Sequence, residues 1–263
     1  MSQSSRPVAL ITGASSGIGA ASALQLAKAG YNVAIIYASN LEGAEASAGV
    51  CQAEGAETLV IQADISEDAA CRAAVAKTTE TWGRLDVLVN NAGTTKFVAA
   101  KDLDGLSVED FERINAVNVA GAFAMTRAAQ PHLEASPIAS VVNVSSQSGI
   151  SGIGSSIAYA ASKGALNTLT LSLARTLAPH IRVNAVCPGF VDTGWHAKSP
   201  KRKATSDVDK FHDRIIAATA LKRMTTADDV ADAVLWFAIS AKAVTGTFLY
   251  IDGGTHLTVG SPL

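Results

Sequence analysis

Short apolar runs alternate along the whole chain with stretches of helical periodicity. Most of the runs are unbroken, which is typical of strands that are covered on both faces in a parallel sheet. The runs are Val8–Ile11, Val33–Tyr37, Thr58–Gln62, Leu85–Val89, Ser140–Val144, Arg182–Val186 and Phe248–Ile251. This alternation predicts an α/β fold: a doubly wound, seven-stranded parallel sheet with helices on both faces.

Helices are expected between these runs, at Gly17–Ala29, Glu42–Glu54, Glu67–Trp82, Ser107–Leu133, Ala158–Ala178 and Ala227–Ile239. Ser66 and Thr226 each precede acidic residues, as helix N-caps do. Gly30 and Gly55 follow helical stretches, where C-cap glycines are common. No linker, repeat or long charge run divides the chain, so we expect one domain over residues 1–263.

Composition excludes several classes of partner. The net charge of −2 offers no general attraction for nucleic acid or an anionic membrane, so neither is expected as a partner. The three cysteines are widely spaced, which indicates a reducing compartment and a cytoplasmic location. The five histidines show no metal-ligand spacing, so no metal is expected.

A glycine-rich turn, Thr12–Gly19, follows the first apolar run and opens the first helix. Its glycines allow a tight turn and a close approach of the backbone to a phosphate, and the helix N-terminus adds N–H donors. The pattern therefore predicts a dinucleotide site, although its Gly-x3-Gly-x-Gly spacing differs from the common Gly-x-Gly-x-x-Gly.

Two further motifs carry polar side chains into the predicted site. Asn90-Asn91-Ala92-Gly93 ends the fourth run and suits a ligand crevice, or alternatively an Asx turn. Tyr159 and Lys163 lie four residues apart, so on a helix they share a face. An ammonium about 5 Å away at an effective dielectric of about 20 favours the phenolate by roughly 3 kcal/mol. That predicts a phenol pKa lowered by about two units towards neutrality.

Together these motifs resemble the short-chain dehydrogenase/reductase family, in its shorter single-domain branch. The resemblance covers about Val8 to Gly254 and rests on the order and spacing of Thr12–Gly19, Asn90–Gly93, Ser146 thirteen residues before Tyr159, Tyr159/Lys163 and Pro188-Gly189. It implies a Rossmann-like fold and an NAD(P)(H)-dependent oxidoreductase that interconverts a carbonyl and a secondary alcohol by hydride transfer.

The resemblance implies four catalytic residues. Tyr159 is the general acid in reduction and the base in oxidation, and Lys163 lowers its pKa and holds the nicotinamide ribose. Ser146 hydrogen-bonds the substrate oxygen, and Asn118 holds a water that relays protons towards Lys163. Neighbouring Ser145 is expected to be structural, because the thirteen-residue offset favours Ser146.

The resemblance also implies a set of cofactor contacts, with Asp64 at the adenine and residues 188–193 at the nicotinamide carboxamide. The set comprises Gly13, Ser15, Ser16, Gly17, Ile18, Gly19, Tyr37, Ser39, Asn40, Asp64, Ile65, Asn91, Ala92, Gly93, Tyr159, Lys163, Pro188, Gly189, Val191 and Thr193. At the end of the second run, Tyr37, Ser39 and Asn40 stand where NAD-preferring enzymes commonly carry an acid. We therefore expect NADP(H) to be preferred, with NAD(H) still usable.

A small-molecule carbonyl or alcohol is the expected substrate, bound by Ser146, Gln147, Tyr159, Phe190 and Trp195. These side chains are mostly apolar and favour a neutral ketone, aldehyde, steroid-like or sugar-like compound. The polar, lysine-rich segment 194–222 is expected to be a mobile lid over that substrate. Ala120–Ala129 and Ala158–Leu177 are apolar on more than one face, which together with the resemblance predicts a homotetramer.

Two alternative functions stay open. One is a 3-oxoacyl-carrier-protein reductase, whose acidic carrier would be attracted by the basic residues of 198–203. The other is a non-catalytic dinucleotide sensor or scaffold on the same fold. Enoyl reductases of this family place six residues between Tyr and Lys; Tyr159 and Lys163 are separated by three, which argues against that activity.

Overall fold

A seven-stranded parallel sheet in the order β3-β2-β1-β4-β5-β6-β7 forms the centre of the computed structural model, which describes residues 6–195 and 208–258. The side chains of 208–211 and 258 are not described. The strands are β1 (Val8–Thr12), β2 (Asn32–Tyr37), β3 (Thr58–Gln62), β4 (Val87–Asn90), β5 (Ser140–Val144), β6 (Arg182–Pro188) and β7 (Phe248–Ile251). All seven predicted runs are strands, and the predicted doubly wound α/β fold is confirmed.

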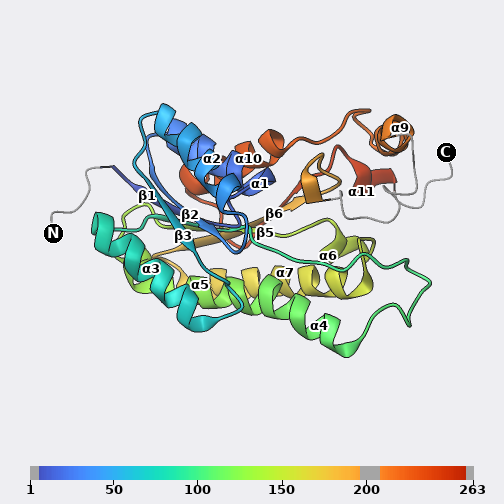
Figure 1. Cartoon of the computed structure of the whole chain (residues 1–263), viewed down its shortest axis with the longest axis horizontal. Coiled ribbons are helices and arrows are strands. Elements are labelled where there is room, and N and C mark those ends of the chain that lie inside the picture. The colour runs from blue at the N-terminus through green and yellow to red at the C-terminus, as the bar shows by residue number, and fades with distance from the viewer. Residues whose placement is uncertain (1–5, 196–207, 259–263) are drawn as a thin grey trace.

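Helices cover both faces of the sheet (Figure 1). One face carries α1 (Gly17–Lys28), α2 (Leu41–Ala53), α10 (Ala227–Leu235) and the π-helical η3 (Trp236–Ser240). The other carries α3 (Asp68–Trp82), α4 (Val108–Asn115), the π-helical η1 (Ala116–Gly121), α5 (Ala122–Glu134) and α7 (Ile157–Leu177). Because side chains alternate along each strand, Ile11 and Ile35 join the first core, whereas Leu10 and Ile36 join the second.

Three described helices were not predicted. They are α6 (Ser148–Ser151), α9 (Val208–Ala218) and α11 (Thr255–Thr258). Two of them have four residues, too few to show a helical period, and α9 lies within the predicted lid. Residues 196–207 of that lid lie outside the described residues, so its mobility stays a prediction.

The predicted caps were right at three positions and wrong at one. Thr226 forms a capping box with Asp229, and Gly30 and Gly55 adopt positive φ just after α1 and α2. Ser66 is not an N-cap: α3 is capped by Glu67 without a side-chain bond. The Ser66 hydroxyl instead donates to the Asp64 carboxylate at 2.7 Å, a contact that removes it from the helix terminus.

The predicted helix over Ser107–Leu133 is continuous but contains η1, a π-helical turn in its middle. Such turns are rare, and they concentrate at functional sites because the extra residue redirects a side chain. Asn118 lies in this turn. Within the described residues, no helix combines the length and apolar character needed to cross a membrane.

Candidate active site

The candidate site lies at the carboxyl ends of β1 and β4, where the strand order reverses. The chain moves from β1 towards β3 on one side of the sheet, and β4 then continues on the other side of β1. Ligands bind in the crevice at such a switch point in open parallel sheets. The glycine-rich turn follows β1 and the Asn90–Gly93 motif follows β4, so the fold brings both predicted motifs to this crevice.

The glycine-rich turn is packed so tightly that it requires glycine. Gly13 and Gly17 have φ of +66° and +55°, a backbone region that favours glycine. A Cβ on Gly19 would lie 2.4 Å from both Asn91 Nδ2 and the Gly13 carbonyl oxygen. The first turn of α1 contains no acidic residue, and the Ser16 side chain makes no capping bond. The helix N-terminus is therefore open to an anion, as a dinucleotide pyrophosphate requires.

Asn91 and Thr12 join the two motifs. Asn91 Nδ2 donates to the carbonyls of Thr12 at 2.9 Å and Gly13 at 3.0 Å. In return, Thr12 Oγ1 accepts from the backbone N–H groups of Asn91 and Ala92, each at 3.0 Å. The predicted cofactor residue Asn91 thus shapes the glycine-rich turn, and its carboxamide is committed to that backbone.

Asn90 faces the interior and makes no contact with the crevice. Its Nδ2 donates to Asn143 Oδ1 at 2.9 Å and to Thr126 Oγ1 at 3.1 Å, which ties β4 to β5 and α5. Asn91 therefore holds the glycine-rich turn, whereas Asn90 holds β4 against β5 and α5.

At the expected adenosine end, the three predicted donors differ in availability. Tyr37 is only 8% exposed and packs in the core, whereas Ser39 is exposed. Asn40 Oδ1 caps α2 by accepting from Gly43 N–H at 3.1 Å, and its donor, Nδ2, bonds to the Ser15 carbonyl at 3.5 Å. Asp64 is exposed, and its Oδ1 accepts from Ser66, while neighbouring Ile65 is buried. Ser39 therefore has the most accessible side-chain donor for a 2′-phosphate.

The segment predicted to bind the nicotinamide carboxamide, residues 188–193, returns to the glycine-rich turn. Gly189 packs so closely on β7 that a Cβ would lie 2.7 Å from Asp252 Cβ. Val191 forms a parallel bridge with Thr225, and the Thr193 methyl group lies 3.4 Å from a Cβ placed on Gly17. The end of β6, including Pro188, and the turn after β1 therefore border the same crevice.

The structure brings three of the four predicted catalytic residues together on α7 and β5. Ser156 caps α7 by accepting from the Tyr159 N–H at 3.2 Å, so Tyr159 lies in the first helical turn. Ser146 follows β5 and bonds through its hydroxyl to Ser148 Oγ at 3.1 Å, and its side chain is near enough to the Tyr159 phenol to lower the pKa of that phenol. Lys163 lies one turn further, is 3% exposed, and donates through Nζ to the Val144 carbonyl at 2.8 Å.

Burial dominates the protonation of this pair. It raises the pKa of Tyr159 to about 12, partly offset by the hydrogen bond with Ser146, and lowers the pKa of Lys163 to about 8. The expected lowering of the Tyr159 pKa by Lys163 is therefore wrong for the protein alone. Nζ lies 5.7 Å from the ring centroid, and low-dielectric surroundings disfavour both charged forms.

Asn118 is brought to the same place by its π-helical turn. Its Oδ1 accepts from Thr94 N–H at 2.7 Å, and its Nδ2 donates to the Thr94 carbonyl at 3.0 Å and to Ser162 Oγ at 2.9 Å. A Cβ on Gly93 would lie 3.3 Å from Asn118 Oδ1 and 3.8 Å from Lys163 Nζ. Thr94 and Ser162 were not predicted as partners of Asn118, although Ser162 directly precedes Lys163 in the sequence.

The aromatic ring of Trp195 packs near Tyr159, where the substrate is predicted to bind. The Trp195 and Tyr159 ring centroids are 6.0 Å apart, and Trp195 is 37% exposed. Gln147 is anchored by its N–H to the Pro188 carbonyl at 2.9 Å, and Phe190 is partly exposed. Apart from Tyr159 on α7, the predicted substrate residues thus come from the segments after β5 and β6.

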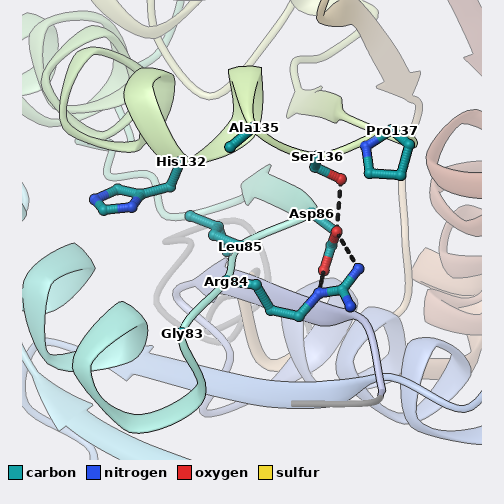
Figure 2. Close-up of a pocket in the computed structure, with 8 residues that line it drawn as sticks. All are labelled: Gly83, Arg84, Leu85, Asp86, His132, Ala135, Ser136 and Pro137. Carbon is teal, nitrogen blue, oxygen red and sulfur yellow. Dashed lines mark hydrogen bonds and ion pairs between the residues drawn. The ribbon is translucent and has the colours of Figure 1, made fainter. Parts of the chain in front are cut away.

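A separate cavity of about 60 Å³ lies at the opposite, amino-terminal ends of the central strands. It is formed by the residues that precede β4 and β5, and Figure 2 shows Asp86 between Arg84 and Ser136. The Asp86 carboxylate accepts a bidentate bond from Arg84 at 2.8 Å and a bond from Ser136 at 2.6 Å. It also accepts from Val8 N–H at 2.8 Å, so this cluster is a structural junction. Among the described residues, no group of three or more His, Cys, Asp or Glu side chains could hold a metal.

The comparisons with known proteins agree with this geometry. A family model described as "Enoyl-(Acyl carrier protein) reductase" matches residues 13–256. A protein from Burkholderia xenovorans assigned to the short-chain dehydrogenases/reductases superposes with a TM-score of 0.88 at 44% identity, covering 97% of this chain and 100% of that one. The chain belongs to the short-chain dehydrogenase/reductase family.

Curated members of this family include two ketoacyl reductases by name. One, assigned as ketoacyl reductase 2 of the granaticin polyketide synthase of Streptomyces violaceoruber, is 42% identical over 95% of this chain and 96% of its own length. The 3-oxoacyl-[acyl-carrier-protein] reductase of Staphylococcus aureus is 35% identical over 95% of this chain and 98% of its own length. This short-chain dehydrogenase/reductase is accordingly an oxidoreductase that uses a nicotinamide dinucleotide.

Proposed function

We propose that the chain interconverts a carbonyl and a secondary alcohol by hydride transfer, with NADP(H) as the preferred cofactor and Tyr159 as general acid/base. One arrangement carries the proposal: Tyr159 shares a helix face with the buried Lys163, whose Nζ lies 5.7 Å from the Tyr159 ring centroid, and the Ser146 side chain is near enough to the phenol to lower its pKa. A carbonyl oxygen placed against the phenol and the Ser146 hydroxyl would meet two hydrogen-bond donors at once.

The protein's own residues perform the proton chemistry. Because burial raises the pKa of Tyr159 to about 12, the phenol is protonated at neutral pH and can donate its proton in the reductive direction. The bound nicotinamide supplies or accepts the hydride. Ser146 stabilises the charge that develops on the substrate oxygen, and Asn118 holds a water that relays protons towards Lys163.

The residues present fit such a cofactor. Gly13, Gly17 and Gly19 form a turn without side chains at the open N-terminus of α1. The preference for NADP(H) is supported by the absence of an acid at the end of β2, where the exposed Ser39 follows Tyr37. Comparing kcat/KM for NADPH and NADH tests it, and a higher value for NADH would contradict it. Tyr37→Asp, and Ser39→Asp at the more exposed position, should both move the preference towards NADH.

The substrate is proposed to be a neutral ketone or related carbonyl compound. Trp195, Gln147 and Phe190 offer mostly apolar contact beside Tyr159. Oxidation of NADPH should be followed with acetophenone, ethyl 3-oxobutanoate, 2,3-butanedione and acetoacetyl-CoA. Turnover of at least one of them, lost in Tyr159→Phe, supports the proposal. Cofactor binding without any turnover would instead support a sensor.

A 3-oxoacyl-carrier-protein reductase is a second candidate, because two relatives are ketoacyl reductases by name. An acetoacetyl group should then be reduced with a much lower KM when it is attached to a carrier protein than when it is attached to coenzyme A. Equal KM values would leave the small-molecule function as the better account.

We further propose a homotetramer in the cytoplasm. Phe123 on α5 and Leu171 on α7 are exposed, at 41% and 45%, on helices that cover one face of the sheet. Burying such side chains against another copy would favour association. All three cysteines are buried free thiols, which suits a reducing compartment. A monomeric mass by light scattering at micromolar concentration would contradict the oligomer.

A further inference from the structure

A series of polar contacts joins the end of β5 to one face of α7. Three consecutive residues at the end of β5 bond to the helix: Asn143 to Thr170 (2.8 Å), the Val144 carbonyl to Lys163 Nζ (2.8 Å) and Ser145 to Asn167 (2.6 Å). The next residue, Ser146, has its side chain near enough to the Tyr159 phenol to lower its pKa. Along the chain, the Ser145–Asn167 contact therefore lies between the proposed catalytic residue Ser146 and the bond made by the proposed catalytic residue Lys163.

Ser145 is the junction of this series. Its hydroxyl donates to Asn167 Oδ1 at 2.6 Å, a short O–H···O bond, and lies 3.3 Å from the Lys163 carbonyl oxygen. Its backbone N–H donates to the Val186 carbonyl at 2.8 Å. Ser145 therefore links β5, β6 and α7 directly before Ser146.

Asn167 continues the catalytic face of α7. Tyr159, Lys163 and Asn167 are spaced by four residues, so their side chains follow one another along one side of the helix. Asn167 is only 6% exposed, and it begins the turn after Lys163. The Ser145–Asn167 bond thus connects the neighbour of Ser146 to the turn that follows Lys163.

We propose that Asn167 is a positioning residue for the reaction, and this inference rests on the proposed function. By accepting from Ser145, it sets the position of the β5 end against α7 and so holds Ser146 opposite Tyr159. Displacing reacting groups by about 1 Å can reduce a rate by about 10²-fold, so a bond this close to both groups affects the rate. Asn167 itself touches neither substrate nor cofactor.

The Asn143–Thr170 contact offers a matched control. It joins the same strand to the same helix, and Thr170 is fully buried, but it lies further from Ser146 and Tyr159 along both elements. Thr170→Val removes its hydroxyl with little change in shape. It should lower Tm while leaving kcat within about twofold of wild type.

The test measures kcat, KM, the pH profile and Tm for Asn167→Leu, Asn167→Asp, Ser145→Ala and Ser145→Thr. The assay uses NADPH and whichever of the four carbonyl probes is reduced fastest. Asn167→Leu and Ser145→Ala should lower kcat by about 10- to 100-fold with KM within about threefold. Asn167→Asp and Ser145→Thr keep the acceptor and the hydroxyl, so they should recover most of kcat. The carboxylate of Asn167→Asp, one turn from Lys163, should also shift the alkaline limb of the profile upwards.

The double variant Ser145→Ala/Asn167→Leu should be no slower than the slower single variant, because both changes remove one bond. If Asn167→Leu does not fold, Ser145→Ala tests the bond from its other end. Suppose that Asn167→Leu and Ser145→Ala keep kcat within twofold of wild type and an unchanged pH profile, and lose Tm only as much as Thr170→Val does. That result would overturn the positioning role of Asn167 and leave the proposed function standing. If the wild-type protein reduces none of the probes, the proposed function fails as well.

Discussion

Gly19→Ala is the sharpest test of how the glycine-rich turn is built. The added Cβ would lie 2.4 Å from Asn91 Nδ2, 2.4 Å from the Gly13 carbonyl oxygen and 2.9 Å from Ala14 Cα. Two of these neighbours are backbone atoms, which cannot move without reshaping the turn. Overpacking costs about 1–3 kcal/mol, and loss of the two Asn91 bonds costs about 0.5–1.5 kcal/mol each. The free energy of unfolding should fall by about 2–6 kcal/mol.

Thermal unfolding and cofactor titration measure the two consequences. In a chain of this size 1 kcal/mol corresponds to about 2–4 °C, so Tm should fall by roughly 10 °C. The Kd for NADPH should rise more than about tenfold, because the substitution displaces the turn that we propose binds the pyrophosphate. Gly49→Ala is the matched control: it lies in α2, a Cβ there meets nothing within 4 Å, and it should raise stability by about 0.5–1 kcal/mol. A Gly19→Ala protein with Tm within 2 °C and Kd within twofold of wild type would refute this account of the turn.

Three further predictions concern Tyr159 and Lys163, the proposed catalytic pair, and the buried carboxylate of Asp86. Tyr159→Phe should lower kcat by about 10²–10⁴-fold while leaving the Kd for NADPH nearly unchanged; a loss below about tenfold contradicts the general acid. The pKa of Lys163 is lowered to about 8, so the unfolded chain binds more protons between pH 8 and its ordinary value, and stability rises with pH there. Lys163→Met should therefore gain most stability over wild type at pH 7, and denaturant unfolding at pH 7 and 9.5 should show that advantage shrinking. Asp86→Ala leaves Arg84, Ser136 and Val8 N–H without their buried acceptor and should cost about 3 kcal/mol by denaturant unfolding, whereas the exposed Asp68→Ala should change little.

Periodicity alone was enough to predict the sheet and most of the helices. Runs such as Val8–Ile11 and Val33–Tyr37 are predominantly apolar because both faces of their strands are covered, and that pattern is local. The short helices α6 and α11 escaped prediction because four residues carry no period. Ser66 was misjudged as the cap by one residue, because α3 begins at Asp68 and its N-cap is Glu67.

The residues of the candidate site were predictable where a motif places them within a few positions of one another. Tyr159 and Lys163 share a face because four residues complete about one helical turn. Hydrogen bonds between residues far apart in the sequence had no such local signal. Thr94 and Ser162 hold Asn118 from 24 and 44 residues away, and Asn167 meets Ser145 across 22 residues. Only the pairing of β4, β5 and α7 brings these groups together.

The sequence by itself determined the element types and which chemical groups the site contains, because helical and strand periods and the motif spacings are local properties. Only the tertiary structure decided the protonation of these groups and how tightly they are packed. A nearby ammonium predicts a lowered Tyr159 pKa, yet burial raises it to about 12 because desolvation depends on atoms from the whole fold. Likewise, Gly19 is required because Asn91, 72 residues further along, occupies the space of its missing side chain.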